Sequence, residues 1–245
     1  MAYNDFASVY DRLMSDCDYS ARADYLLGLF RRNASEPKLM LDLACGTGSL
    51  AIEMIKRGVD VIGVDPSADM LNIAKSKAAE NNVDLLCLCQ SGEELDLFGT
   101  VDSAVCTLDS INHICDYDEL KATVAKVSLF LEPNGLFIFD VNTEYKHENV
   151  LGDNTFVIED EDVYCVWQNM TDMPYTTVVL DVFTERNGLY ERFNEEFEER
   201  AYSVDELTDA LHQTGFEIVE ILGDMTLDAP QNDCERMIFV TRKMN

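Results

Sequence analysis

A glycine-rich turn carries the strongest chemical signal in the sequence. The segment Leu41–Ala51 reads LDLACGTGSLA, an apolar run that meets Gly46 and Gly48 and continues as a helical stretch. Glycine lets the backbone turn sharply and approach a ligand, and the helix N-terminus beyond it offers free N–H groups. Gly46, Gly48 and Ala51 also match the dinucleotide-binding fingerprint. The turn therefore predicts a nucleotide-like ligand, but it does not say whether that ligand is a dinucleotide.

Two acidic residues narrow the choice of ligand. Asp42 lies inside the apolar run, where a carboxylate needs a cationic or hydrogen-bonding partner. Its charge would repel a pyrophosphate and attract the ammonium group of an amino-acid moiety. Asp65 ends the next apolar run, VIGVD, where its carboxylate is placed to accept both hydroxyls of a ribose, and Met70 is placed to cover an adenine face. A helix-capping role ahead of Ser67 is the alternative for Asp65.

At these residues the sequence resembles the class I S-adenosylmethionine-dependent methyltransferases. The joint signal is D-x-A-C-G-T-G followed by V-I-G-V-D-x-S-x-x-M-L, and the resemblance covers nearly the whole chain. It is closest to bacterial small-molecule methyltransferases that carry a β insertion before the last crossover helix. It implies an enzyme of class EC 2.1.1.- that binds S-adenosyl-L-methionine, releases S-adenosyl-L-homocysteine and methylates an N or O nucleophile of a small acceptor.

The resemblance also assigns cofactor contacts. Asp42 and its glycine turn would surround the methionine half, Asp65 would bind the ribose, and Tyr10 would bring a ring over the cofactor. Where the family often has an acidic residue for the adenine amino group, this chain has Gln90 and Ser91. The predicted cofactor-binding residues are Tyr10, Asp42, Ala44, Gly46, Gly48, Asp65, Pro66, Met70, Gln90, Ser91 and Leu108.

The acceptor side is marked by the segment Thr107–His113, which reads TLDSINH and follows the fourth strand. Methyl transfer needs alignment, exclusion of water and removal of a proton from a hydroxyl or ammonium nucleophile. His113 and Asp109 are the catalytic candidates, with His113 as the base near neutral pH. A capping or packing role is the alternative for His113. Aromatic residues of the insertion are expected to wall the pocket, namely Tyr145, Trp167 and Tyr175.

The elements that must position these residues form a parallel α/β pattern. Apolar runs alternate with amphipathic helical stretches, which predicts a Rossmann-like, doubly wound sheet with helices on both faces. The resemblance implies seven mostly parallel strands with the last one antiparallel. The predicted strands are Leu39–Ala44, Val59–Asp65, Leu85–Gln90, Val101–Leu108, Leu136–Val141, Glu217–Leu222 and Met237–Arg242.

An insertion interrupts this rhythm. Residues 143–201 read as a small antiparallel β subdomain with a hairpin turn at Asn187-Gly188, and Ser203 with Glu206 predicts a capping box at the next helix. We therefore expect a cofactor-binding domain formed by residues 1–142 and 202–245. The N-terminal helices, residues 1–35, would cap it, and Phe6, Val9, Tyr10, Leu13 and Met14 form an apolar stripe there.

The formal net charge of −29 limits the partners of the protein. Such a field repels phosphate backbones and anionic headgroups, so we expect no nucleic-acid and no membrane partner. No export signal and no apolar run of membrane-spanning length is present, which predicts a cytoplasmic protein. We expect it to be a monomer or homodimer. The 8 cysteines lack the spacing of metal ligands, so we expect no metal.

Three other functions are compatible with parts of the sequence. A nicotinamide-dependent oxidoreductase would use the same glycine turn, although Asp42 argues against it. A non-catalytic module that binds S-adenosylmethionine or S-adenosylhomocysteine would share the whole cofactor half. A methyltransferase of RNA or protein would need a basic footprint, which the net charge does not provide.

Overall fold

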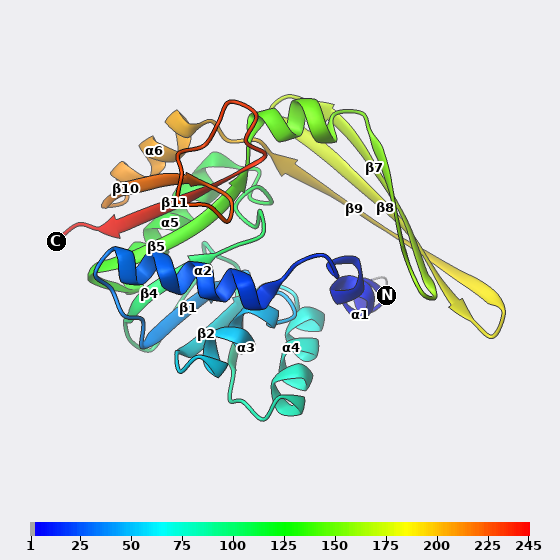
Figure 1. The fold of residues 1–245 in the computed structure, drawn as a ribbon, viewed down its shortest axis with the longest axis horizontal. Coiled ribbons are helices and arrows are strands. Elements are labelled where there is room, and N and C mark those ends of the chain that lie inside the picture. The colour runs from blue at the N-terminus through cyan, green and yellow to red at the C-terminus, as the bar shows by residue number, and fades with distance from the viewer. Residues whose placement is uncertain (1–2) are drawn as a thin grey trace.

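The computed structural model describes residues 3–245 and contains a seven-stranded sheet of order β10-β11-β5-β4-β1-β2-β3 (Figure 1). Strand β11 runs antiparallel to both of its neighbours, whereas β1 to β5 pair in parallel. The predicted fold class is therefore confirmed. The strands are β1 (Leu39–Leu43), β2 (Asp60–Asp65), β3 (Leu86–Cys89), β4 (Val101–Cys106), β5 (Leu131–Asn142), β10 (Phe216–Gly223) and β11 (Arg236–Lys243).

Helices cover both faces of this sheet. One apolar cluster joins the sheet to α5 (Tyr117–Phe130) and α6 (Val204–Gln213), and a second joins it to α2 (Tyr19–Arg32) and α3 (Ser49–Lys56). Helix α4 (Ala68–Glu80) connects β2 to β3. Among residues 3–245, no helix has both the length and the apolar character needed to cross a bilayer.

A second sheet extends away from the first (Figure 1). Its order is β6-β7-β8-β9, and it follows a π-helix, η1 (Lys146–Leu151). The sequence pattern pointed to the later strands and missed the first one. The division of the chain at residues 143 and 201 stays a prediction. The strands are β6 (Thr155–Asp160), β7 (Val163–Asp172), β8 (Tyr175–Arg186) and β9 (Leu189–Arg200).

Helix α1 (Tyr3–Leu13) packs against this second sheet rather than against the parallel one. Val9 belongs to an apolar cluster with Val163 and Val182, and Phe6 and Leu13 lie against the same cluster. α1 also contacts α4. The N-terminal stripe therefore joins the inserted sheet to the cofactor half of the molecule.

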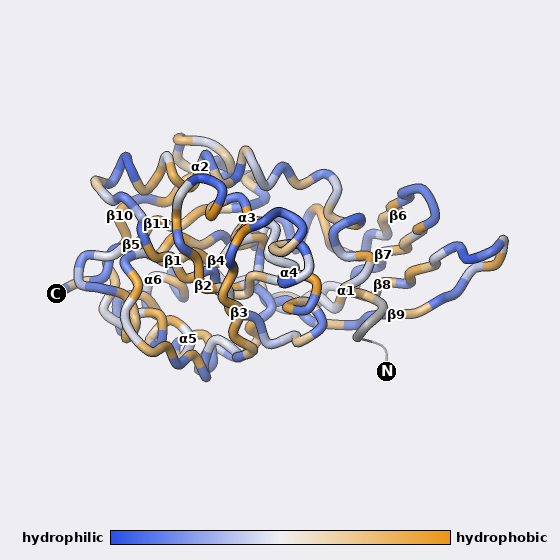
Figure 2. The backbone as a smooth tube through the Cα atoms, turned by 90° about the horizontal axis from the view of Figure 1, so that it is seen from below, coloured by the Kyte–Doolittle hydropathy of each residue, from blue (hydrophilic) through white to orange (hydrophobic). Residues whose placement is uncertain are grey.

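Local sequence signals account for a hairpin turn and for the start of a helix. Asn187 and Gly188 both have positive φ angles, as the predicted hairpin turn between β8 and β9 requires. Ser203 and Glu206 form the predicted capping box at the start of α6. Figure 2 shows hydrophobic colour along much of the central strands and an alternation of hydrophilic and hydrophobic colour along the long hairpins. This alternation is typical of antiparallel strands with one solvated face.

Gly48→Ala tests how the glycine turn is packed. Gly48 has a φ of +72°, and a Cβ there would lie 3.0 Å from the Cβ of Ala74. We expect the substitution to lower the free energy of unfolding by about 1–3 kcal/mol, measured by urea denaturation, because strain and crowding add. Gly58→Ala is the matched control, since Gly58 has a φ of +88° with nothing within 4 Å of its Cβ position. Equal losses of unfolding free energy in the two variants would show that the contact with Ala74 does not contribute.

Candidate functional site

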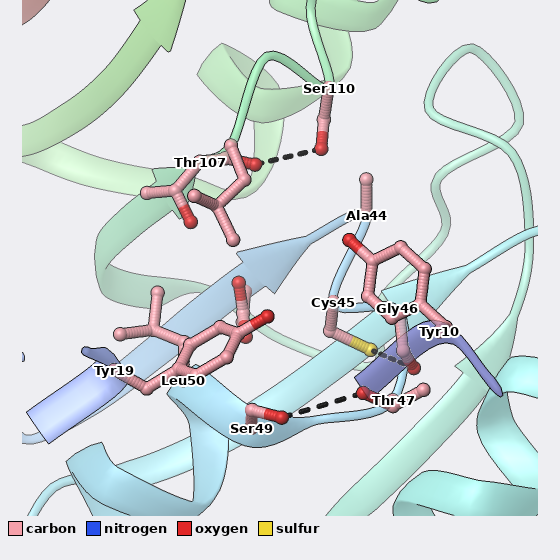
Figure 3. A pocket seen from close by; sticks show the side chains of 12 residues that line it. Tyr10, Tyr19, Ala44, Cys45, Gly46, Thr47, Ser49, Leu50, Thr107 and Ser110 are labelled. Atoms are coloured by element: carbon pink, nitrogen blue, oxygen red, sulfur yellow. Dashed lines mark hydrogen bonds between the residues drawn. The ribbon is translucent and has the colours of Figure 1, made fainter. Parts of the chain in front are cut away.

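A pocket lies at the carboxyl ends of β1 and β4, neighbouring strands whose following helices cover opposite faces of the sheet. Such a switch point is where open α/β sheets bind ligands. Figure 3 shows side chains from the turn after β1 facing those from the turn after β4. The pocket is lined by Tyr10, Tyr19, Asp42, Ala44, Cys45, Gly46, Thr47, Ser49, Leu50, Thr107, Leu108 and Ser110.

Asp42 is the least compensated charged group in this pocket. Its residue is 3% exposed, and its Oδ2 atom has no hydrogen-bond partner among the described residues. Burial, together with the nearby charge of Asp65, raises the pKa of Asp42 to about 7. A buried carboxylate without a cation is costly to the fold, so the pocket is suited to a ligand that carries an ammonium group.

Asp65 joins the two loops that follow β1 and β2. Its Oδ2 accepts from the backbone N–H of Gly46 at 2.9 Å, and its Oδ1 accepts from that of Ser67 at 2.8 Å. Burial raises the pKa of Asp65, and these two hydrogen bonds act in the opposite direction. The carboxylate is therefore fixed in orientation, and the N-cap of the helix that follows is Ser67, which accepts from the backbone N–H of Met70.

The turn after β4 is held in an unusual conformation by a carboxylate of β5. Leu108 and Asp109 have φ angles of 59° and 56°, in the left-handed region that non-glycine residues rarely adopt. Both of their backbone N–H groups donate to Asp140, at 2.8 and 2.7 Å. Asp140 is fully buried and lies 3.0 Å from Arg236 Nη1 and 3.6 Å from Arg22 Nη1. This buried ion cluster compensates for the backbone strain.

Asp109 is fixed by the same cluster. Its Oδ2 accepts from Asn142 Nδ2 at 2.6 Å and lies 3.2 Å from Arg236 Nη2. Burial alone would raise the pKa of Asp109, but the positive charges of Arg236 and Lys146 and the hydrogen bond from Asn142 act in the opposite direction, and the pKa is lowered. Asp109 is therefore ionised and paired at neutral pH.

His113 is outside the lining of this pocket and has a half-exposed side chain, 45% of which is accessible. Its ring packs on Phe197 of β9 with the ring centroids 4.9 Å apart. Its Nε2 lies 3.9 Å from Glu199 Oε1. Desolvation by the surrounding protein lowers the pKa of His113, although the charges of Asp109 and Asp65 oppose this. The imidazole is neutral at pH 7 and is able to accept a proton.

A polar network ties α1 to the glycine turn. Lys77 of α4 donates to Asp11 and to Ser49, both at 2.5 Å, and Thr47 donates to Asp11 at 2.5 Å. Tyr10, next to Asp11, lines the pocket, and burial raises its pKa. The phenol is therefore neutral at physiological pH, and its ring is available to cover a ligand.

Comparisons with known proteins agree with this geometry. Residues 40–135 match the model of the family described as "Methyltransferase domain". The chain is 33% identical to YqeM of Bacillus subtilis (strain 168), whose name places it with the methyltransferases, over 99% of this chain and 98% of that protein. A solved S-adenosylmethionine-dependent methyltransferase from Clostridium acetobutylicum ATCC 824 has a TM-score of 0.91 at 32% identity, over 99% of both chains.

The chain belongs to the class I S-adenosylmethionine-dependent methyltransferases. It is an enzyme of class EC 2.1.1.-, and its cofactor is S-adenosylmethionine. The nicotinamide alternative is therefore wrong. A further relative is a dTDP-3-amino-3,4,6-trideoxy-alpha-D-glucopyranose N,N-dimethyltransferase of Streptomyces venezuelae, 31% identical over 56% of each chain.

The methyltransferase brings some of the predicted cofactor residues together at the pocket and leaves others outside its lining. Gln90 uses its side chain to bond Asp96, at 3.1 and 3.3 Å, and Ser91 donates to Glu94 at 3.2 Å. Pro66 is exposed and Met70 is partly buried. The cofactor roles of these residues stay predictions. The predicted residues that line the pocket are Tyr10, Asp42, Ala44, Gly46 and Leu108.

The aromatic residues expected at the acceptor wall do not line this pocket. Trp167 packs instead into the cluster between α1 and the inserted sheet, and its Nε1 donates to Asn169 at 2.7 Å. Tyr145 and Tyr175 are exposed.

Sequence reasoning missed several groups of this methyltransferase site. Asp140 carried a usable signal, because it is a carboxylate inside an apolar run, as Asp42 is. Arg236 and Glu199 had no local signal, since both act through contacts between segments far apart in the sequence. Three further residues also line the pocket. Thr47 lies in the glycine turn, Ser49 begins α3 and Tyr19 begins α2.

Asp42→Asn tests the role of the buried carboxylate. Because the pKa of Asp42 is about 7 and an ammonium ligand favours the ionised form, binding of S-adenosylmethionine should strengthen as the pH rises from about 5 to about 7. The loss below pH 7 should approach tenfold per pH unit. We expect the Asn variant to bind about 10–100-fold more weakly, with a flat profile over this range, in calorimetric titrations. An unchanged pH slope in the variant would assign the titration to another group.

Proposed function

We propose that this enzyme methylates an N or O nucleophile of a small-molecule acceptor with the help of His113. The observation that supports the proposal is that His113 belongs to the turn after β4, the same turn whose Thr107, Leu108 and Ser110 line the pocket. The aminosugar N,N-dimethyltransferase among its relatives supports a small acceptor. S-adenosylmethionine supplies a methyl group on a sulfonium leaving group, so the protein needs only to align the acceptor and to take its proton.

The residues around the pocket fit the two halves of the cofactor. Asp42 would bind the amino group of the methionine half, because its free Oδ2 atom lacks a positive partner. Asp65 would accept the ribose hydroxyls with its orientation already fixed by Gly46 and Ser67. Tyr10 would cover the reacting end and attract the sulfonium through its ring. Gly48, Pro66, Met70, Gln90, Ser91 and Leu108 complete the proposed cofactor set.

His113 and Asp109 have different tasks in this proposal. His113 takes a proton from the acceptor, since its lowered pKa leaves it neutral at pH 7. Asp109 is paired with Arg236 and Asn142, so it orients the acceptor and favours the imidazolium that forms, without itself taking the proton. This division follows the general pattern of a base supported by a fixed carboxylate.

The net charge of the protein supports a small-molecule acceptor. A net charge of −29 disfavours nucleic-acid substrates, because phosphate backbones carry the same sign of charge. We propose a cytoplasmic enzyme that acts as a monomer or homodimer, without a metal ion, a nucleic-acid partner or a membrane partner.

Calorimetry with S-adenosylmethionine and with Asp65→Ala tests the cofactor half of the proposal. We expect micromolar binding to the wild type and a loss of about 10–100-fold or more in the variant, because hydrogen bonds to a charged carboxylate disappear. Asp60→Ala is the matched control, since Asp60 is an exposed carboxylate on the same strand. Equal affinities of the Asp65 and Asp60 variants for S-adenosylmethionine would contradict the ribose assignment. NADH should not bind to the wild type.

A further inference from the structure

Every described contact of the Asp140 carboxyl group is with a hydrogen-bond donor. Its Oδ2 accepts from the backbone N–H of Leu108 at 2.8 Å, and its Oδ1 accepts from that of Asp109 at 2.7 Å. Arg236 Nη1 donates to the same Oδ1 at 3.0 Å, and Arg22 Nη1 lies 3.6 Å from Oδ2. Burial raises the pKa of Asp140, but Arg236, Arg22 and the N–H of Asp109 oppose the rise. Because none of these groups can accept a proton, the fully buried Asp140 is a carboxylate.

The two arginines that face Asp140 are held in place by other carboxylates. Arg236 of β11 lies with its Nη2 3.2 Å from Asp109 Oδ2, so its guanidinium group bridges the side chains of Asp140 and Asp109. Arg22 of α2 donates from Nη1 and Nη2 to the two carboxylate oxygens of Asp224, each at 3.1 Å. Both arginine side chains are largely buried. The direction of the Asp140 carboxylate is therefore fixed by groups from α2 and β11, far from it in the sequence.

The backbone that Asp140 holds is in a conformation that it would not keep by itself. Leu108 and Asp109 are consecutive non-glycine residues with φ angles of 59° and 56°. Each such residue is strained and persists only where its surroundings determine it. Asp109 is bound at its backbone by Asp140 and at its side chain by Asn142, which donates to Oδ2 at 2.6 Å. Without the two hydrogen bonds to Asp140, the turn would therefore relax toward negative φ angles.

The turn that is held in this way forms one wall of the pocket. Thr107, Leu108 and Ser110 line the pocket and face the residues of the glycine turn (Figure 3). Asp140 is outside the lining, so it acts on a ligand in the pocket only through the turn. A relaxed turn would move Leu108 and change the shape of this wall.

We propose that Asp140 is a positioning residue for S-adenosylmethionine, because it fixes the Leu108–Asp109 turn in the shape that faces the glycine turn. The inference rests on the proposed function, in which the cofactor occupies this pocket. A wall that is already ordered does not have to be ordered by the ligand, so binding is stronger. Arg236 and Arg22 serve the same end by holding the Asp140 carboxylate in its direction. Asp140 itself neither gains nor loses a proton during methyl transfer.

NMR spectra of the ¹⁵N-labelled protein without cofactor test the hold of Asp140 on the turn. In the wild type, the amide protons of Leu108 and Asp109 should resonate downfield, because each is bound to a carboxylate oxygen. Each should also show a strong nuclear Overhauser effect to its own Hα, as a positive φ requires. In Asp140→Asn the side chain can accept at one atom only, and its NH₂ group faces a donor. At least one of the two amide protons should therefore move upfield in this variant.

Calorimetric titration with S-adenosylmethionine separates positioning from general stability. We expect Asp140→Asn to weaken binding by about 10–100-fold, because the strained turn is no longer held before the ligand arrives. Asp102→Asn is the matched control. Asp102 also accepts from two successive backbone N–H groups, those of Lys38 and Leu39 at 3.0 and 2.9 Å, but it lies at the start of β4, away from the pocket. This control should keep the affinity of the wild type.

Arg236→Lys is a second variant, which takes the place of Asp140→Asn if that protein does not fold. A lysine keeps the positive charge but cannot bridge Asp140 and Asp109 with two nitrogens. We expect a weaker affinity for S-adenosylmethionine than in the wild type, together with a shift of the Asp109 amide proton.

Two results would overturn the inference. One is a wild-type spectrum in which Leu108 and Asp109 lack the downfield amide protons. The other is a folded Asp140→Asn variant that binds S-adenosylmethionine as tightly as Asp102→Asn does. In either case Asp65→Ala would still lose affinity if the cofactor occupies this pocket, whereas wild-type affinity in Asp65→Ala would contradict the proposed function itself.

Discussion

The unpaired carboxylate oxygen of Asp42 is the interaction that the rest of the site depends on. Asp42 lies on the central strand β1, where its partners in register are Gly63 of β2 and Val105 of β4. Neither neighbour can neutralise a charge, and Asp65 raises the pKa of Asp42 further. The fold therefore maintains a costly group that either a proton or a cationic ligand compensates. A cofactor with an ammonium group and a sulfonium fits that requirement, whereas a pyrophosphate does not.

Three carboxylates near the carboxyl ends of parallel strands are compensated in three ways, and this difference separates binding from positioning. Asp140 on β5 is neutralised by Arg236 and Arg22 and holds the turn after β4. Asp65 on β2 has two backbone donors that fix its direction. Asp42 has no cation. In the proposed function, the first acts as structure, the second would accept hydrogen bonds from a ligand in a fixed direction, and the third would offer the main charge to a ligand.

The second sheet, whose strands are far from the glycine turn in the sequence, contributes residues next to the turn after β4. Strand β9 brings Phe197 and Glu199 to His113, and α1 packs on the same sheet while placing Tyr10 over the cofactor pocket. In the proposed function, the second sheet would therefore link the cofactor side and the acceptor side of the site. A change in the packing of that subdomain would alter both halves together.

Local patterns in the sequence were sufficient to predict the strands of the main sheet, the glycine turn, the capping box at Ser203 and the hairpin at Asn187. They missed β6, a six-residue edge strand, although Gly152, Asp153 and Asn154 give a turn signal directly before it. The cofactor roles of Gln90 and Ser91 stay predictions, and their side chains bond Asp96 and Glu94 within their own loop. Arg236 and Glu199 depend on contacts across long sequence separations, which periodicity does not report.

A crystal structure with bound S-adenosylhomocysteine tests the central claim most directly, because this product keeps the amino group and the ribose. The account predicts the ligand amino group within hydrogen-bond distance of Asp42 Oδ2 and the ribose hydroxyls on Asp65. A ligand whose amino group lies elsewhere, with Asp42 Oδ2 still lacking a cationic partner, would contradict it.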